Sequence, residues 1–298
     1  MLFTPRIALW GIPQIIKVRA FSTSPGLFRS DLSYQVFGPE KESATRNPIV
    51  FLHGLFGSKQ NNRSISRALA RDVKREVYIV DLRNHGASFH DTEHTYPVMA
   101  NDVADFINEH GLTKCVLIGH SMGAKAAMTL ALTKPSLVSS LIPVDNAPVT
   151  ATLKSDFAKY ITGMKAIESS RVTKQSDADA ILERYEKSLP IRQFLLTNLV
   201  RDAESGTMKF RVPLGTLGDA LKGMGEFPFN QPGEKVFGGP TLVVRGTRSP
   251  YVKDETRDAI KGFFPDSRVV DVESGHWVIS ENPEGFRKAV VEFLENVD

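Results

Sequence analysis

A serine enclosed by two glycines is the residue with the clearest chemical potential in this sequence. Residues 119–123 read Gly-His-Ser-Met-Gly, after the apolar run 115–118 and before the helix-forming stretch 124–132. A strand that turns sharply into a helix is typical of a nucleophile elbow, in which strained backbone exposes a serine hydroxyl. The alternative is a structural serine in a tight turn, but the strand-turn-helix setting favours Ser121 as a nucleophile.

A serine hydroxyl attacks a carbonyl only when a neighbouring base takes its proton and a third group orients that base. His276 is the best placed of the seven histidines. It lies in the loop 273–277, after a predicted strand at 267–272 and before a C-terminal helix that starts near Asn282. We therefore predict that His276 is the base, with a capping or surface histidine as the alternative.

The orienting acid is harder to locate. It commonly lies in the turn after a later strand of the sheet, which here is the predicted strand 241–244. Residues 245–250 in that turn read Arg-Gly-Thr-Arg-Ser-Pro and contain no carboxylate. Asp145 instead ends the strand that follows the nucleophile strand, where a carboxylate can reach the imidazole from a neighbouring strand end. We predict Asp145 as the acid. Asp254 is the second choice, although a charge at a helix start explains it better.

A glycine-rich turn follows the predicted strand 49–52. Residues 53–58 read His-Gly-Leu-Phe-Gly-Ser, and such a turn can direct backbone N–H groups at a developing oxyanion. The predicted donors are Leu55 or Phe56, together with Met122, the residue after the nucleophile. The side chains of Phe56 and Trp277 would line a substrate pocket if their loops converge, and both are equally explained as core aromatics.

Two further groups of polar residues have structural interpretations. Asp81 and Arg83 end another strand, and we expect them to form a structural ion pair. His90 and His94 have the spacing of a helical metal pair, but a third ligand is missing and the stretch is a hydrophilic loop. We predict no metal site.

Short apolar runs alternate with helical stretches along the chain. These elements must hold the candidate site residues in position. The runs are 49–52, 77–80, 115–118, 141–144 and 241–244, and the helical stretches are 63–73, 98–109 and 124–133. Continuous apolar strands are expected where both faces of a sheet are covered. The pattern predicts an α/β fold with a doubly wound, mostly parallel sheet, and residues 31–37 as an antiparallel edge strand.

The alternation stops between about residues 146 and 239. This segment contains charged, helix-compatible stretches such as 177–188 and 191–201 and no convincing strand. An insertion at this point of a parallel sheet is expected to cover the catalytic edge. We predict a helical cap over about 146–239 within one domain at 22–298.

The N-terminal thirty residues contain basic residues but no Asp or Glu, which is typical of a mitochondrial presequence. We expect residues 1–21 to be removed after Phe21. That segment holds Arg6, Lys17 and Arg19, so the formal charge falls from +3 to 3 − 3 = 0. A neutral protein disfavours nucleic-acid binding. Pro13 interrupts the longest apolar N-terminal run, which disfavours a membrane anchor.

The sequence therefore predicts a mitochondrial matrix protein without integral membrane association. The single cysteine, Cys115, falls in a predicted buried strand, which excludes a disulfide framework and fits a reduced compartment.

Six motifs in register resemble one group within the α/β-hydrolase superfamily, from Asp31 to the C-terminus. The group comprises mitochondrial abhydrolase-domain esterases, bacterial short-chain acyl esterases and fungal ethanol acetyltransferases. The motifs are residues 53–58, 81–88, 119–125, 144–148, 194–199 and 274–277. The resemblance implies that Ser121, Asp145 and His276 form the catalytic triad, because this group carries its acid after the strand that follows the elbow strand. The elbow sequence is closer to that of the esterases.

The resemblance implies an acyl-serine intermediate formed from a small acyl ester or thioester and released to water or to a small alcohol. Hydrolysis of short-chain esters or thioesters is our first interpretation. The alternative is an alcohol O-acetyltransferase that takes acetyl-CoA as acyl donor and an alcohol such as ethanol as acceptor. A third hypothesis, from another class, is a non-catalytic matrix protein that binds a partner. No cofactor is expected, and no residue indicates which protein partner would bind.

Overall fold

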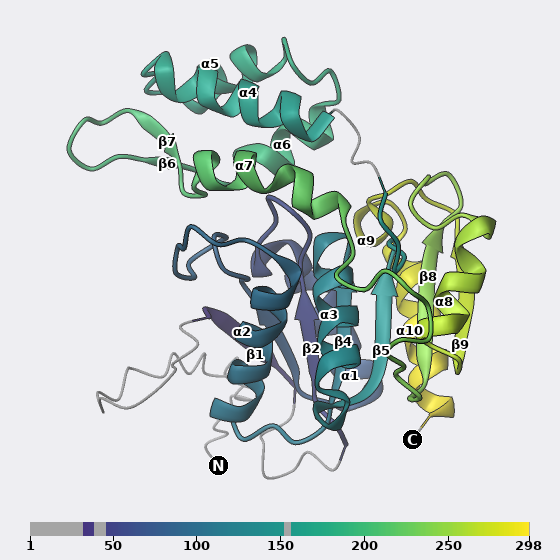
Figure 1. Ribbon diagram of the computed structural model, residues 1–298. Coiled ribbons are helices and arrows are strands. Elements are labelled where there is room, and N and C mark those ends of the chain that lie inside the picture. The colour runs from purple at the N-terminus through teal and green to yellow at the C-terminus, as the bar shows by residue number, and fades with distance from the viewer. Residues whose placement is uncertain (1–31, 39–45, 152–155, 298) are drawn as a thin grey trace, which may run out of the picture.

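A seven-stranded sheet with helices on both faces forms the centre of the protein (Figure 1). The computed structural model describes residues 32–38, 46–151 and 156–297. The strand order is β1-β3-β2-β4-β5-β8-β9. The presequence expected at residues 1–21 lies outside the described residues.

All strands of this sheet run parallel except the first. β1 pairs antiparallel with β3, as expected for the edge, and every other pairing in the sheet is parallel. Both β2 and β3 are buried along their whole length, since helices cover both faces. The strands are β1 (Tyr34–Phe37), β2 (Ile49–Leu52), β3 (Val77–Val80), β4 (Cys115–His120), β5 (Val138–Val144), β8 (Thr241–Gly246) and β9 (Ser267–Val272).

Two hydrophobic cores lie on opposite faces of the sheet because alternate strand residues point to opposite sides. Val50 and Leu52 of β2 pack into one core with the helices α2 and α3, whereas Ile49 and Phe51 pack into the other with α1 and α10. The helices outside the cap are α1 (Arg63–Val73), α2 (Tyr96–Glu109), α3 (Met122–Thr133), α8 (Arg257–Phe263), α9 (Val278–Glu281) and α10 (Pro283–Asn296). Short 3₁₀ segments occur at Lys59–Asn62, Pro135–Leu137 and Asp254–Thr256.

The segment between β5 and β8 forms a cap on the side of the molecule to which the arrowheads of β2 and β5 point (Figure 1). It contains α4 (Asp156–Ser169), α5 (Gln175–Leu182), α6 (Leu189–Leu196), β6 (Leu199–Arg201), β7 (Met208–Phe210) and α7 (Leu214–Gly225). The carboxyl ends of parallel strands meet at this edge. The cap therefore covers the edge that carries the candidate site.

The expectation of a cap without strands is wrong. β6 and β7 form a two-stranded antiparallel hairpin, and the helix predicted over 191–201 ends at Leu196. Each strand has only three residues, which is too short to show the alternation that identifies a half-buried strand in a sequence.

The expected ion pair between Asp81 and Arg83 is also wrong. Arg83 makes a bidentate pair with Asp102 of α2, with nitrogen–oxygen distances of 2.6 and 2.8 Å. Asp81 instead binds the ammonium group of Lys59 and accepts the backbone N–H of Ala87 at 2.9 Å. Asp81 and Arg83 are close in sequence, which suggested that they pair. In the fold, each side chain binds a partner on another element.

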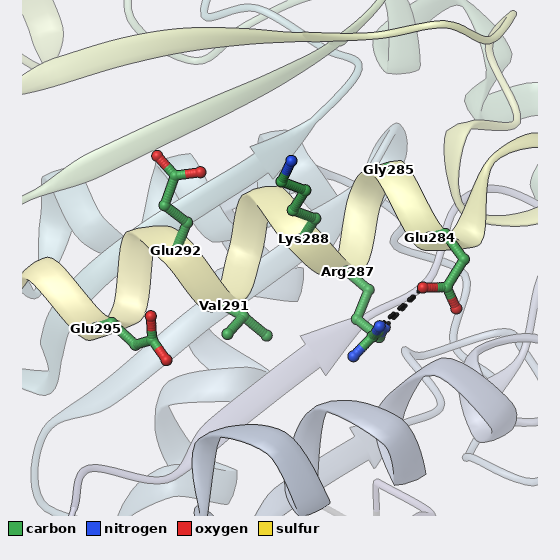
Figure 2. Close-up of a pocket in the computed structure, with 7 residues that line it drawn as sticks. All are labelled: Glu284, Gly285, Arg287, Lys288, Val291, Glu292 and Glu295. Atoms are coloured by element: carbon green, nitrogen blue, oxygen red, sulfur yellow. Dashed lines mark hydrogen bonds and ion pairs between the residues drawn. The ribbon is translucent and has the colours of Figure 1, made fainter.

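A surface groove runs along the outer side of α10 (Figure 2). Arg287 in this groove pairs with Glu284 on the same helix and with Asp72 of α1. The groove is lined by Glu284, Gly285, Arg287, Lys288, Val291, Glu292 and Glu295, none of which belongs to the elbow or the loop of His276. Within the described ranges, no helix combines the length and the apolar character needed to cross a bilayer.

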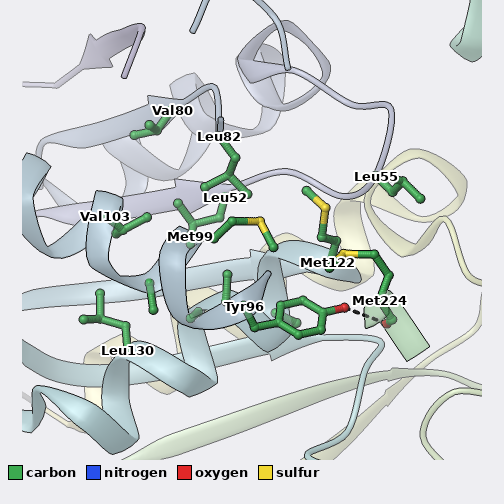
Figure 3. Close-up of a cluster of buried hydrophobic side chains, with 14 of the residues drawn as sticks. Leu52, Leu55, Val80, Leu82, Tyr96, Met99, Val103, Met122, Leu130 and Met224 are labelled. Carbon is green, nitrogen blue, oxygen red and sulfur yellow. Dashed lines mark hydrogen bonds between the residues drawn. The ribbon is translucent and has the colours of Figure 1, made fainter. Parts of the chain in front are cut away.

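The end of α7 is fastened to the core beside the elbow. Tyr96 of α2 donates its hydroxyl to the carbonyl of Met224 at 2.7 Å (Figure 3), and Met224 and Met122 belong to the same buried hydrophobic cluster. The ammonium group of Lys125 in α3 donates to the carbonyls of Gly225 and Glu226, each at 2.9 Å. The C-terminal end of a helix leaves carbonyls without intrahelical partners. Tyr96 and Lys125 donate hydrogen bonds to these carbonyls.

Candidate active site

The nucleophile elbow forms as the sequence predicts. Ser121 links β4 to α3 with φ 54° and ψ −112°, a backbone conformation that L-residues rarely adopt. A Cβ atom added to Gly119 would lie 2.2 Å from the carbonyl oxygen of Gly123, and one added to Gly123 would lie 2.6 Å from that of His53. Both contacts are impossible, so the two glycines allow the strand and the helix to meet at the serine.

Three predicted side chains form one hydrogen-bonded chain. His276 Nε2 lies 2.9 Å from Ser121 Oγ, and His276 Nδ1 lies 2.7 Å from Asp145 Oδ2. A carboxylate only accepts hydrogen bonds, so Nδ1 carries the proton and Nε2 presents a lone pair to the serine hydroxyl. This tautomer is the one that can accept a proton from Ser121.

Asp145 is fully buried at the end of β5 and is held by more than the imidazole. Its Oδ1 accepts the backbone N–H of Gly246 at 3.0 Å, and its Oδ2 accepts the hydroxyl of Ser249. Three donors therefore fix the orientation of this carboxylate. Asp254, the second choice, is exposed and pairs with Arg245 and Arg257, which explains it as a surface charge.

Two other rings flank His276. Tyr251 lies with its ring centroid 4.3 Å from that of the imidazole. His120, the residue before the nucleophile, donates from Nε2 to the carbonyl of His276 at 2.8 Å. Burial lowers the pKa of His120 to about 4, so this imidazole is neutral at pH 7 and can keep its role as a donor. His120 thus ties the elbow to the loop that carries His276.

The structure separates the three predicted oxyanion donors. Within the described part of the chain, the N–H groups of Leu55 and Met122 have no hydrogen-bond acceptor. The N–H of Phe56, in contrast, donates to Nε2 of His85 at 3.1 Å. Phe56 is therefore already engaged, and of the two donors predicted in this turn Leu55 is the one that remains free. Met122 begins α3, so its N–H also lies at the positive end of the helix dipole.

The two predicted pocket aromatics differ in burial. Phe56 is only 1% exposed and its ring faces Phe157 of α4, which makes it a core contact between the turn and the cap. Trp277 is partly exposed, and its ring lies 4.7 Å from that of Phe194 in α6 and 6.0 Å from that of His120. Trp277 remains the candidate for a pocket wall.

Sequence reasoning missed three polar residues that support these groups: His85, Asn198 and Ser249. Ser249 lies in the turn after β8, where the acid of such a site is commonly found, so its position could have indicated a residue that supports the site. His85 and Asn198 lie 29 and 142 residues from Phe56, to which they bind, and no local pattern connects them. Among the described residues, no group of three or more His, Cys, Asp or Glu side chains could hold a metal ion.

The chain is similar to enzymes that are named for two different activities. It is 41% identical over 272 residues to the sn-1-specific diacylglycerol lipase ABHD11 of Xenopus laevis, covering 89% of this chain and 84% of that protein. It is 40% identical over 287 residues to a probable alcohol acetyltransferase of Saccharomyces cerevisiae, covering 89% of this chain and 83% of that protein.

A solved structure agrees with these relatives. The structure described as a marine microorganism esterase has 30% sequence identity and a TM-score of 0.81, and the match covers 88% of this chain and 99% of that one. The sequence also matches the model of the alpha/beta hydrolase fold family over residues 47–283, which include the elbow, Asp145 and His276. The chain therefore belongs to the alpha/beta hydrolase fold family.

Proposed function

We propose that this protein is a serine hydrolase that cleaves short-chain carboxylic esters or acyl thioesters through an acyl-serine intermediate. The observation that carries the proposal is the hydrogen-bonded chain from Ser121 Oγ to His276 and on to Asp145, with distances of 2.9 and 2.7 Å. A hydroxyl, an imidazole and a buried carboxylate in this order are the parts that acyl transfer requires.

In the acylation step, Ser121 Oγ attacks the carbonyl carbon of the substrate while its proton moves to Nε2 of His276. The negative charge that develops on the carbonyl oxygen is stabilised by the N–H groups of Leu55 and Met122. Asp145 stabilises the imidazolium that forms. The tetrahedral intermediate collapses when the bond to the leaving oxygen or sulfur breaks, and His276 gives its proton to that atom.

The acyl group leaves the enzyme by the reverse sequence. His276, now neutral, takes a proton from an acceptor hydroxyl, which attacks the acyl-serine carbonyl. Collapse of the second intermediate breaks the bond to Ser121 Oγ and returns the proton to that oxygen. If the acceptor is water the product is a carboxylic acid, and if it is an alcohol the product is a new ester.

Alcohol O-acetylation is the second candidate. The 40% identity to the yeast protein named as a probable alcohol acetyltransferase is nearly equal to the 41% identity to the lipase, so overall similarity does not separate them. Water is present at about 55 M, so an alcohol competes only if the site binds and orients it, which well-ordered sites can do. Acetyl-CoA would then be the acyl donor and ethanol an example of the acceptor.

The main test is turnover of p-nitrophenyl acetate and butyrate by the purified chain. Ser121→Ala should abolish turnover, and a fluorophosphonate should label Ser121, as mapped by mass spectrometry. Ser66→Ala is a matched control because the Ser66 hydroxyl is buried in α1 and has no hydrogen-bond partner among the described residues. Full activity of the Ser121→Ala protein would overturn the proposal.

Two further measurements define the reaction. The ratio of ethyl acetate to acetate, formed from acetyl-CoA in the presence of ethanol, separates transfer from hydrolysis. A series of acyl lengths that ends in a diacylglycerol tests whether the substrate of the ABHD11 relatives applies here. Activity on acetyl and butyryl esters with none on the diacylglycerol is the expected result.

A third candidate is a matrix protein that binds a partner and does not depend on catalysis. The assembled Ser121, His276 and Asp145 argue against it, since a binding role does not need a serine aligned with a base. Rescue of a deletion phenotype by the Ser121→Ala protein would favour it.

The proposal includes a mitochondrial matrix location, supported by the composition of residues 1–30, which contain no acidic residue. Cells that express the full chain should contain a mature protein that begins at Ser22. A mature protein that begins at Met1 would contradict this part of the proposal.

A further inference from the structure

The turn that carries the oxyanion donor contains an unusual residue. The N–H of Gly57 donates to the carbonyl of Gly54 at 2.9 Å, which closes a four-residue turn with Leu55 and Phe56 at its centre. Phe56 has φ 61°, a left-handed conformation that turns normally assign to Gly or Asn. For a bulky side chain this conformation is strained and persists only where the surroundings impose it.

Two side chains from different parts of the protein impose it. On one side, His85 Nε2 accepts the N–H of Phe56 at 3.1 Å. On the other side, Asn198 Nδ2 donates to the carbonyl of Phe56 at 2.7 Å. Since this acceptor is a carbonyl, only the NH₂ end of the amide can face it. Both the N–H and the carbonyl of the strained residue are therefore bound.

Each of the two clamping side chains is itself fixed. His85 donates from Nδ1 to the carbonyl of Arg83 at 3.0 Å, which leaves Nε2 as the acceptor, and burial lowers its pKa well below the usual value. Asn198 is 2% exposed, and its backbone carbonyl accepts the N–H of Arg211 at 2.9 Å. Hydrogen bonds to other parts of the protein therefore hold both His85 and Asn198 in place.

At the centre of this turn, the N–H of Leu55 is not engaged by the protein. The carbonyl of Gly54 accepts from His53 Nδ1 at 2.8 Å as well as from the N–H of Gly57. The N–H and the carbonyl of Phe56 are bound as described above. Among the described residues, the N–H of Leu55 has no acceptor, so this central donor of the clamped turn is free to bind a substrate oxygen.

Asn198 does not belong to the sheet domain. It follows α6 and precedes β6, so it is contributed by the cap. On the same segment, Phe194 packs against Trp277, beside the base. The stretch from 194 to 199 thus contacts both the turn of the oxyanion donor and the loop of His276. We infer that Asn198 is a positioning residue through which the docked cap sets the geometry of the oxyanion hole.

This inference rests on the proposed function and deepens it. It assigns the cap a part in transition-state stabilisation in addition to covering the site. If the amide of Asn198 is lost, the carbonyl of Phe56 loses its donor and the turn can relax toward an unstrained conformation. The N–H of Leu55 then points away from the position that the oxyanion requires.

The first test is Asn198→Ala in the full chain. We expect kcat for p-nitrophenyl acetate to fall about 10- to 100-fold, less than the roughly 10²- to 10³-fold loss that follows removal of an oxyanion donor. KM should stay within about threefold, because the ground-state carbonyl depends little on this donor. The inhibition constant of a trifluoromethyl ketone, whose adduct carries an oxyanion, should rise in parallel with the loss in kcat/KM. Gln193→Ala, an exposed position in α6, is the control and should match the wild type.

The second test is Asn198→Asp, which keeps the shape of the side chain and makes its donor depend on pH. When the new carboxyl is protonated, its O–H can donate to the Phe56 carbonyl; when it is ionised, two oxygens face each other and repel. The kcat ratio of Asn198→Asp to wild type should therefore rise at least threefold from pH 8 to pH 5.5. The corresponding ratio for Asn198→Ala should stay flat.

All rates are expressed per active serine, counted by complete fluorophosphonate labelling, so that a misfolded fraction does not enter kcat. Wild-type kcat per labelled serine in Asn198→Ala would overturn the positioning role, as would a pH-independent ratio for Asn198→Asp. If the wild type neither labels nor turns over the ester, the proposed function itself fails, and that outcome is separate from the failure of the Asn198 inference.

Discussion

The hydroxyl of Ser249 donates a hydrogen bond to Asp145 Oδ2, the same oxygen that faces Nδ1 of His276. Ser249 lies in the turn after β8, where the acid of such a site is commonly found. The turn after β5 supplies the carboxylate instead, and the turn after β8 supplies a donor that holds it. Both turns therefore contribute to the one hydrogen-bonded carboxylate beside the imidazole.

This geometry predicts that the carboxylate can be supplied from the turn after β8 in place of the turn after β5. Asp145→Ser alone should lower kcat by about 10⁴-fold, because His276 loses the group that fixes its tautomer. In the exchange variant Asp145→Ser/Ser249→Asp, the carboxylate starts from the other turn and again reaches Nδ1. We expect kcat to recover at least tenfold relative to Asp145→Ser.

The comparison is made with p-nitrophenyl butyrate at fixed pH. Ser249→Ala is the control and should lose much less activity than Asp145→Ser, since the carboxylate stays in place. An exchange variant that folds cooperatively and is no more active than Asp145→Ser would show that the two turns are not equivalent.

The close packing behind the nucleophile gives a prediction on stability. A Cβ atom at Gly123 would lie 2.6 Å from the carbonyl oxygens of both Leu52 and His53, and these are backbone atoms that cannot turn away. Gly123→Ala should therefore destabilise the fold by several kcal/mol and abolish esterase activity. Urea unfolding followed by circular dichroism measures the first effect.

Gly215 offers a matched control in the same type of element. It lies in α7, and a Cβ atom added there would meet nothing within 4 Å. Gly215→Ala should be neutral or stabilise the protein by up to about 1 kcal/mol, as expected for alanine in a helix. Equal effects of the two substitutions would refute the steric argument.

The sequence predicts the elements around the site well because their signals are local. The strands at 49–52, 77–80 and 267–272 and the helix at 63–73 have the predicted bounds, since each combines an apolar pattern with clear ends. Ser121 is identified by the pattern in which it sits. The positions of Asp145 and His276 follow from chain order and from the rule that parallel strand ends share one edge.

The remaining features depend on contacts that are distant in sequence. The choice between Leu55 and Phe56 as donor is decided by His85, which comes from another strand end. The partner of Arg83 is Asp102 in α2 and not its neighbour Asp81, because the folded chain brings the two together. Nothing near Asn198 in the sequence indicates that its amide binds a carbonyl in the core. Local patterns give the elements, whereas these pairings arise only on folding.

The buried histidines predict a loss of stability in mild acid. Burial lowers the pKa of His94 to about 4, below its ordinary value of 6.5. Between these values the unfolded chain binds more protons than the folded one, so the free energy of unfolding falls as the pH falls through this window. Between pH 7 and pH 5, the contribution of His94 is about 2 kcal/mol.

Urea unfolding of wild type and His94→Gln at both pH values measures this contribution. The wild type should lose about 2 kcal/mol more than the variant between pH 7 and pH 5. His90→Gln, at an exposed position four residues away, is the control and should follow the wild type. Parallel losses in wild type and His94→Gln would mean that His94 is not the group that titrates.

The lysine that fastens the cap predicts a gain in stability at high pH. Burial lowers the pKa of Lys125 to about 8 from its ordinary value of 10.5. Below pH 8 the ammonium group is charged in both states and its desolvation lowers stability. As the pH rises from 8 toward 10.5, the folded state releases this proton first, so the unfolded state binds more protons and the free energy of unfolding increases.

The test compares wild type with Lys125→Met at pH 7 and at pH 9.5. The neutral amine keeps two N–H groups for the carbonyls of Gly225 and Glu226, so the anchor of α7 persists after the proton is lost. The stability of wild type relative to Lys125→Met should therefore increase by about 2 kcal/mol over this range. Tyr96→Phe removes the neighbouring bond to Met224 without removing an amine, and its difference from wild type should not change between these pH values. A constant difference between wild type and Lys125→Met would mean that the ammonium group is solvated in the folded protein and that burial does not lower its pKa.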